Sequence, residues 1–374
     1  MQSRICLISI VVSTAILGSS ACGAVPPLSA TPTPALAASP TLVPTETSDP
    51  TPGPGRLETG EITSRALAGN LLGDPATRTF QVYLPAGYDA TNQRYPVAYV
   101  LHWYTGTYVT FSGTTSASLE APISSHNVKP MILVFPDASN KLGGSMYRSS
   151  ATIGDYETYL AQELVQQIDA TYRTLPDRES RGVMGCSMGG IGAIHLGLKY
   201  PNVFGVAAPM SPTTYDFQDD PQWETLARFL MYVPQNMDDF RRMPLQAKFL
   251  IAMAAATAPN PDKPPFYLDM PLKDVGGKVE IVPEVFDKLN AVDPMSDVRP
   301  YLAQPVRLRG LLVYNDTDNG DSPAESAFEL DAAHRFDKTL TTLGIAHEYA
   351  EVNAGHCEFD FSPILEFMGA HLMY

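Results

Sequence analysis

The sequence predicts an α/β fold with a largely parallel sheet covered by helices on both faces. From about Leu57 onward, apolar strand-like runs alternate with amphipathic helical stretches, which favours parallel βαβ units. Several runs are apolar throughout, as is typical of strands covered on both faces. A serine flanked by glycines also lies where one such run passes into a helical pattern. The predicted strands are Thr79–Leu84, Val97–Leu101, Met131–Phe135, Arg181–Cys186, Val203–Ala207, Leu308–Tyr314 and His347–Val352.

Apolar residues at helical spacing predict the helices that cover this sheet. The longest pattern runs over Tyr156–Tyr172, a second follows the serine turn, and two more lie toward the C-terminus. The marker residues are Leu160, Leu164, Val165, Ile168 and Tyr172 in the first helix, Ile191, Ile194 and Leu198 in the second, Phe336, Leu340 and Leu343 in the third, and the segment Ile364–Leu372 as the fourth.

Composition limits the size of the fold and the class of partner. The chain has 374 residues, 44% of them hydrophobic and 17% charged, which suits one large domain or two small ones. Its formal net charge of −15 is spread along the chain. Because an acidic chain repels phosphate backbones and anionic membrane surfaces, we expect no nucleic-acid partner.

Residues 1–22 are predicted to be an export signal outside the fold. Arg4 supplies the positive start, and the apolar run Ile5–Leu17 is too short to span a bilayer. The small residues before Cys22 resemble a bacterial lipoprotein cleavage box, in which this cysteine becomes lipidated. Ser19, where that box usually has leucine, and Ala21 also suit ordinary secretory cleavage. We therefore expect an extracytoplasmic protein, lipid-anchored at the bacterial cell surface, with free secretion as the alternative.

The exported chain is predicted to have a disordered tether at 23–56 and a catalytic domain at 57–374. Pro, Thr and Ser dominate the tether, which has too few large apolar residues to repay the entropy of ordering. Within the domain, the strand–helix alternation stops over 212–305, which carries helical pieces such as Trp223–Met231 and Leu245–Ala256. We interpret this segment as a lid beside the active site; extra core helices are the alternative.

The segment Gly185-Cys186-Ser187-Met188-Gly189 fits G-x-S-x-G, the nucleophile elbow of the α/β-hydrolase fold. The serine of such an elbow sits on a strained turn, where a side chain at either glycine would collide with the neighbouring strand or helix. An apolar strand pattern precedes the motif and a helical pattern follows it. This context predicts the α/β-hydrolase fold, with Ser187 as the nucleophile.

A serine nucleophile needs a base, and in this fold the order along the chain is serine, acid, histidine. His356 follows Gly355 in a loop after the last clear strand, where the catalytic histidine is expected. The other downstream histidines fall within regular elements: His195 on the elbow helix, His334 in a helix, His347 in a strand and His371 in the last helix. We predict His356 as the base and His195 as a structural residue.

The catalytic acid is expected in the loop after Leu308–Tyr314. We predict Asp318, because Asn315 three residues earlier tolerates the left-handed turn that is usually given to glycine. Asp316 and Asp321 remain open. A calcium loop is rejected here, since neither frame combines Gly at position six with Glu at twelve, and no Cys/His spacing suggests zinc. No metal and no cofactor are expected.

Two backbone N–H groups are predicted to stabilise the negative charge of a tetrahedral intermediate. One belongs to Met188, directly after the nucleophile. The other lies in the loop after Val97–Leu101, and we assign it to Tyr104.

From about Arg78 to its end, the chain resembles the esterase group that contains esterase D, bacterial feruloyl esterases and the mycolyltransferases. The resemblance rests on YPVAYVLH, ILVFPDA, GDYETYLAQELVQQIDATYRT, RGVMGCSMGGIGAIHLGLKYP and NAGH. It implies the triad Ser187, Asp318 and His356, acting on feruloyl or acetyl esters of plant polysaccharides, small thioesters or acyl sugars. One departure is His102-Trp103, where the group usually has HG; the bulky Trp103 is expected to reshape the acyl side of the pocket.

A narrower resemblance concerns two cysteines. Cys186 precedes Ser187 and Cys357 follows His356, which is similar to the bonded CS-D-HC arrangement of tannases and fungal feruloyl esterases. An oxidising compartment and the required closeness of serine and histidine also favour a Cys186–Cys357 disulfide. The alternative is a small buried Cys186 and a free thiol at Cys357.

Taken together, these features predict a serine carboxylic-ester hydrolase acting on small-molecule or polysaccharide-linked esters, with feruloyl and acetyl esters favoured. Two alternatives remain open at this point: an acyltransferase that uses a sugar hydroxyl as acceptor, and a surface binding protein on a hydrolase fold.

Overall fold

The computed structural model describes residues 54–111, 119, 121–123, 128–212, 234–276, 278–318, 323–358 and 360–374. The predicted signal at 1–22, its Cys22 and most of the tether lie outside these residues. So do the predicted helix Trp223–Met231 and Asp321. Among the described residues, no helix has the length and apolar content to cross a membrane.

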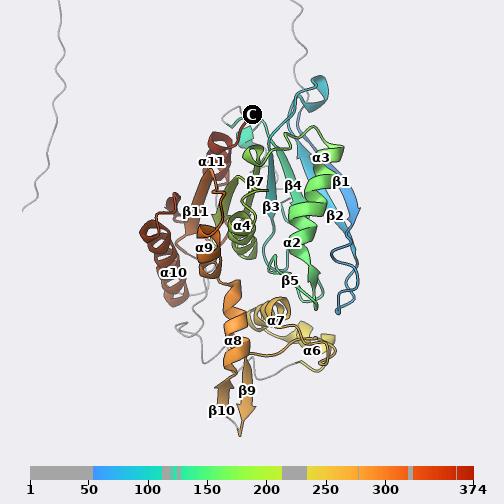
Figure 1. The fold of residues 1–374 in the computed structure, drawn as a ribbon, viewed down its shortest axis with the longest axis vertical. Coiled ribbons are helices and arrows are strands. Elements are labelled where there is room, and N and C mark those ends of the chain that lie inside the picture. The colour runs from blue at the N-terminus through green and yellow to red at the C-terminus, as the bar shows by residue number, and fades with distance from the viewer. Residues whose placement is uncertain are drawn as a thin grey trace, which may run out of the picture. The chain divides into compact units, whose positions relative to one another are not determined.

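An eight-stranded sheet forms the centre of the folded part of the chain, which begins at about residue 54 (Figure 1). All neighbouring strands from β4 onward are parallel, while β2 pairs antiparallel with both β1 and β4. In spatial order the strands are β1 (Arg56–Thr63), β2 (Thr77–Leu84), β4 (Ile132–Pro136), β3 (Val97–Leu101), β7 (Arg181–Cys186), β8 (Val206–Met210), β11 (Gly310–Asp316) and β12 (Glu348–Val352). The predicted mostly parallel sheet is therefore confirmed.

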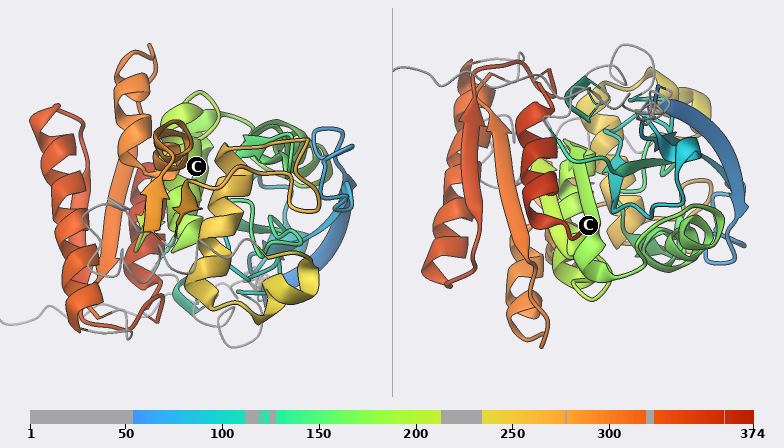
Figure 2. Two further views of the ribbon diagram at one scale, coloured as in Figure 1. Left: turned by 90° about the horizontal axis from the view of Figure 1, so that it is seen from below. Right: turned by 90° about the horizontal axis from the view of Figure 1, so that it is seen from above.

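Helices cover both faces of the sheet, because successive side chains of its central strands point to opposite sides. In β3, Tyr99 belongs to the same apolar cluster as α3 (Val165–Thr171), α4 (Met188–Lys199) and α10 (Pro323–Thr342), whereas the neighbouring Val100 packs in the cluster that contains α11 (Ser362–His371). Figures 1 and 2 agree that β1 and α10 lie at opposite edges.

Several predicted bounds need correction. The predicted helix Tyr156–Tyr172 is one helical segment made of α2 (Tyr156–Thr158), a π-helical turn η2 (Tyr159–Leu164) and α3. Strand β1 was not predicted, and it begins at Arg56, the last residue assigned to the tether. The sixth predicted strand ends two residues too early, since β11 continues to Asp316.

The segment between β8 and β11 holds its own small elements. They are α6 (Met237–Arg242), α7 (Leu245–Thr257), β9 (Leu272–Val275), β10 (Lys278–Ile281), α8 (Pro283–Leu289), η4 (Asn290–Val292) and α9 (Met295–Leu302). The predicted helix over Leu245–Ala256 is thus confirmed as α7. In Figure 1, α6 to α8 and the β9–β10 hairpin gather at the end of the sheet away from the C-terminus. Near the C-terminus, the carbonyl of Met373 accepts a hydrogen bond from Ser180, which directly precedes β7. The C-terminus therefore lies at the end of the sheet where β7 begins, and these elements lie at the end where β7 finishes.

A buried polar cluster joins this insertion to the elbow helix. His195 of α4 lies 2.9 Å from Asp297 of α9 and 3.1 Å from Glu157 of α2, and Arg148 bonds the same Asp297 at 3.0 Å. Burial raises the pKa of both carboxyl groups, but their hydrogen bonds and charge pairing with His195 outweigh it and hold each pKa below its usual range. These contacts support the prediction that His195 is structural.

Candidate active site

Ser187 lies on a strained turn between β7 and α4. Its backbone has φ 58° and ψ −122°, in a region that residues with a side chain rarely adopt. A Cβ added at Gly185 would lie 2.6 Å from the carbonyl oxygen of Gly189, and one added at Gly189 would lie 2.1 Å from that of Leu101. Both clashes are with backbone, so the motif's two glycines are required and the turn has the geometry of a nucleophile elbow.

His356 is paired with an aspartate, but this aspartate is Asp316 and the prediction of Asp318 was wrong. The distance from His356 Nδ1 to Asp316 Oδ2 is 3.2 Å. The Asp316 side chain is 5% exposed and the imidazole is 30% exposed, so the carboxylate is the more buried of the two groups. Asp318 is exposed, two residues past the end of β11.

The correction has a physical cause in strand pairing. Asn315 and Asp316 pair in parallel register with Glu351 and Val352 of β12, so the ladder extends β11 past its apolar run. The acid therefore closes the strand, as expected for this fold, but the strand ends two residues later than its hydrophobicity indicates. The alternative Asp316, left open by the sequence, is the residue that the structure brings to His356.

The environment of Asp316 favours its charged form. Its Oδ2 accepts a hydrogen bond from Ser211 Oγ at 2.5 Å and one from the backbone N–H of Cys357 at 3.2 Å. Burial raises the pKa of this carboxyl, but the close contact with His356 and the hydrogen bond from Ser211 outweigh burial and lower the pKa below its ordinary value. A carboxylate in this state can orient the imidazole and stabilise its positive charge.

The structure contains the predicted disulfide between Cys186 and Cys357. The S–S distance is 1.97 Å, the Cα atoms are 6.0 Å apart, and the two residues are 171 apart in sequence. Cys186 is fully buried at the end of β7. The bond therefore attaches the loop that carries His356 to the base of the turn that carries Ser187.

The loop after β3 is held by a buried imidazole. The backbone N–H of Ala138 donates to His102 Nε2 at 2.9 Å, so Nδ1 carries the proton and donates to the carbonyl of Trp103 at 2.8 Å. Burial lowers the pKa of His102, which agrees with a neutral ring. Tyr147 Oη donates to the carbonyl of His102 at 2.8 Å. The backbone leading into Tyr104 is thereby fixed from three directions.

The two predicted oxyanion donors remain available in this arrangement. Within the residues that the structure describes, neither the backbone N–H of Tyr104 nor that of Met188 has an acceptor in the chain. The side chains of both residues pack against Gly143-Gly144, where an added Cβ would come within 2.8 Å of the Tyr104 ring or 2.4 Å of Met188 Sδ. This glycine pair was not singled out in the sequence, since only the fold shows its two neighbours.

Trp103 packs in a different apolar cluster from Tyr104 and Met188. Its ring lies edge-on to Phe111, with the ring centroids 5.4 Å apart, and it packs on the same apolar cluster as Cys357. The indole therefore lies on the disulfide side of the site, at the position where the resembling esterases usually have glycine.

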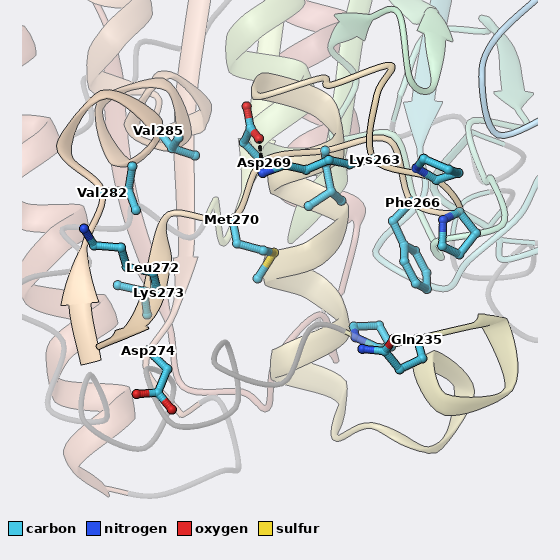
Figure 3. A pocket seen from close by; sticks show the side chains of 14 residues that line it. Gln235, Lys263, Phe266, Asp269, Met270, Leu272, Lys273, Asp274, Val282 and Val285 are labelled. Atoms are coloured by element: carbon cyan, nitrogen blue, oxygen red, sulfur yellow. Dashed lines mark ion pairs between the residues drawn. The ribbon is translucent and has the colours of Figure 1, made fainter. Parts of the chain in front are cut away.

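The insertion reaches the site through α7. The ring of Phe249 meets the Tyr104 ring edge-on with centroids 5.0 Å apart, and Tyr104 Oη donates to the carbonyl of Leu142. A separate cavity of about 730 Å³ lies farther out in the insertion, between the β9–β10 hairpin and the loop around Phe266 (Figure 3). Its lining mixes apolar residues with the ion pair between Lys263 and Asp269.

Comparison with known proteins supports an esterase relationship. Over 146 residues the chain is 30% identical to an endo-1,4-β-xylanase/feruloyl esterase of Xylanibacter ruminicola, covering 37% of this chain and 20% of that protein. Over 135 residues it is 33% identical to an esterase of Mycobacterium tuberculosis, covering 35% of this chain and 28% of that protein. The chain thus spans less than a third of the length of these curated relatives.

Solved structures share the fold. A ferulic acid esterase matches with a TM-score of 0.54 and 18% identity, over 86% of this chain and all of that one (100%). The S-formylglutathione hydrolase of Staphylococcus aureus matches with a TM-score of 0.54 and 15% identity, over 84% of this chain and 99% of that one. These likenesses show the α/β-hydrolase fold.

The model of the family described as "Putative esterase" matches residues 75–266, just over half of the chain. The match includes the predicted oxyanion loop and the whole elbow. This chain therefore belongs to that esterase family.

Proposed function

We propose that the protein is a serine carboxylic-ester hydrolase that works through an acyl-enzyme. The observation that carries this proposal is the pairing of His356 with the buried, charged Asp316. The disulfide holds the loop that carries His356 next to the turn that carries Ser187. A serine hydroxyl is a weak nucleophile unless a base takes its proton, and this loop supplies an oriented base.

The reaction would follow from these groups. Ser187 Oγ attacks the ester carbonyl while His356 takes its proton, and Asp316 stabilises the resulting imidazolium. The oxyanion accepts hydrogen bonds from the N–H groups of Tyr104 and Met188. When the C–O bond breaks, His356 returns the proton to the leaving alcohol. Water then repeats the sequence on the acyl-enzyme, which releases the acid and restores Ser187.

For the substrate, we propose feruloyl or acetyl esters of plant polysaccharides or related aromatic esters. Support comes from the relative named as a xylanase/feruloyl esterase and from the apolar contact of α7 with the Tyr104 loop, which makes the insertion a wall beside the acyl group. The relatives are named as esterases, so neither the acyltransferase nor the binding protein is favoured.

A panel of chromogenic esters tests the proposal. The purified mature chain should hydrolyse at least one of acetyl, longer acyl and feruloyl esters, with the highest kcat/KM on acetyl or feruloyl. Product analysis with and without added sugar should show the free acid in both cases. If the folded protein hydrolyses no member of the panel, or if acyl sugar is the main product, the proposed reaction is wrong.

We also propose that the chain is exported and lipid-anchored through Cys22, with 23–55 as the tether. The apolar run before Cys22 and the Pro/Thr/Ser-rich stretch after it support this proposal. Incorporation of labelled palmitate that disappears in Cys22→Ser would agree with it, and equal labelling of both chains would contradict it.

Reduction of the disulfide is expected to lower activity before the sheet unfolds. The bond closes a loop of about 170 residues, worth about 5 kcal/mol on the chain-entropy model, and it also holds the His356 loop to the elbow. We expect roughly a tenfold or larger fall in kcat as the two thiols become titratable, since small misplacement of a catalytic group is costly. Far-UV circular dichroism should change later along the reductant series.

The double variant Cys186→Ala/Cys357→Ala provides the matching permanent change. It should show the same reduced kcat and a lower Tm in the absence of reductant. Full activity in this variant, or in reduced wild type with two free thiols, would mean that the bond does not position His356.

A further inference from the structure

Ser211, which follows β8 directly, contacts Asp316 through both its donor and its acceptor. Ser211 Oγ donates to Asp316 Oδ2 at 2.5 Å, and the backbone N–H of Asp316 donates back to Ser211 Oγ at 3.1 Å. The backbone N–H of Ser211 donates to the carbonyl of Tyr314 at 2.7 Å. One buried hydroxyl therefore satisfies two groups of the same aspartate, so the contact is specific to a side chain that can donate and accept at once.

The backbone at Ser211 is held in an unfavourable conformation. Its φ is 40°, in the left-handed region where a residue with a Cβ costs free energy, yet the chain has serine here and not glycine. The residue is also buried, with 6% of its surface exposed. The hydroxyl is thus retained at a position where glycine would relieve the backbone, and strain of this kind is often found at functional sites.

The end of β8 also touches the nucleophile. The carbonyl of Met210 accepts the backbone N–H of Ser187 at 3.1 Å, and the next residue is Ser211. Two consecutive residues therefore bond the turn of the nucleophile and the carboxylate of the acid. The end of β8 therefore holds the turn of Ser187 and the carboxylate of Asp316 in a fixed relative position.

We propose that Ser211 is a positioning residue for the catalytic acid: it fixes the rotation of the Asp316 carboxylate and so the orientation of the His356 ring. This inference rests on the proposed hydrolase function. Oδ2 of Asp316 lies 2.5 Å from Ser211 Oγ, 3.2 Å from the backbone nitrogen of Cys357 and 3.2 Å from His356 Nδ1. The contact with Ser211 is the shortest of the three. Without the hydroxyl, the carboxylate can turn about its Cβ–Cγ bond, and its charge is shared with one donor fewer.

The test compares two hydroxyl-free variants, Ser211→Gly and Ser211→Ala, on an ester that the wild type hydrolyses. Glycine tolerates φ 40°, so Ser211→Gly removes the hydroxyl without adding backbone strain. Both variants should lose about 10- to 100-fold in kcat with KM within about twofold, because the loss concerns orientation and not substrate binding.

The pH profile separates this role from a purely structural one. Removing a donor from Oδ2 concentrates negative charge on the carboxylate, which favours protonation of both Asp316 and His356. The acid limb of kcat/KM, which reports the free enzyme's essential base, should therefore move to higher pH in both variants. A loss of stability alone would lower the amount of active enzyme, but the acid limb of the kcat/KM profile would stay at the wild-type pH.

Ser180→Ala is the matched control. Ser180 is also buried, at 4% exposed, and its Oγ donates to the carbonyl of Met373 at 2.7 Å, but it lies before β7 at the far end of the sheet. It should keep the wild-type kcat and acid limb. Folded Ser211→Gly with kcat within threefold of wild type and an unmoved acid limb would overturn the inference. An inactive wild type would instead contradict the proposed function itself.

Discussion

Ser187→Ala is expected to reduce ester hydrolysis by several orders of magnitude, up to about 10⁶-fold in kcat, while leaving the fold intact. The groups of a triad act as a unit, so loss of the nucleophile removes nearly all of their joint effect. The change deletes one oxygen at a turn whose strain is set by Gly185, Gly189 and the backbone bond to Met210. The measurement is kcat/KM on the best ester of the panel, with Tm and circular dichroism as checks of folding.

Ser180→Ala again serves as the control, since it removes a buried hydroxyl far from the elbow. A second readout does not depend on turnover. A phosphonyl fluoride should form a bond between Ser187 Oγ and phosphorus with release of fluoride, and mass spectrometry should locate the added mass on the elbow peptide. Ser187→Ala should show no such adduct. More than a tenth of wild-type turnover in Ser187→Ala would contradict the mechanism.

The elbow could be predicted from sequence because its geometry leaves few choices. Glycine at 185 and 189 is required by backbone atoms less than 3 Å away, and the strand before the motif is buried along its whole length. The bounds of β3 and β7 were also predicted correctly, and every residue of each strand is buried.

The bounds of β8 were predicted three residues too early, although every residue of this strand is buried. β8 was predicted as Val203–Ala207 but spans Val206–Met210, which includes Pro209, a residue that cannot donate to the ladder. Its register opposite the end of β7 is set by pairing of Met210 with Cys186, which lies far away in sequence. Ser211 was therefore not recognised, because nothing local marks the residue that will meet the acid.

β1 was missed because it is an edge strand with mostly exposed side chains. Its sequence, RLETGEIT, lacks the apolar run used to identify the other strands. Antiparallel pairing with β2 along its whole length holds it in the sheet. The helix after Asp155 was predicted over nearly its correct span, but its π-helical turn was not, since the spacing of Leu160, Leu164, Val165 and Ile168 fits either type of helix.

The acid provides the sharpest contrast between sequence and structure, and Asp316→Asn is expected to cost roughly 10⁴-fold in kcat. Asparagine keeps the volume and still accepts the bond from Ser211, but its neutral amide cannot stabilise the imidazolium and can turn an N–H toward His356. Asp318→Asn should stay within about threefold of wild type, because this residue is exposed two positions beyond the strand. Steady-state kinetics on one ester compares the two variants directly.

Acid unfolding gives an independent check of the same assignment. The pKa of Asp316 is lower in the folded state than in the unfolded chain, so the stability it contributes is fully present above the unfolded pKa and is lost as pH falls through the folded pKa. Asp316→Asn should therefore have a flatter dependence of Tm on pH below about pH 4 than Asp318→Asn, given the usual aspartate pKa. If Asp318→Asn is the crippling change and Asp316→Asn is mild, then His356 is oriented by the exposed loop and the ladder between β11 and β12 does not supply the acid.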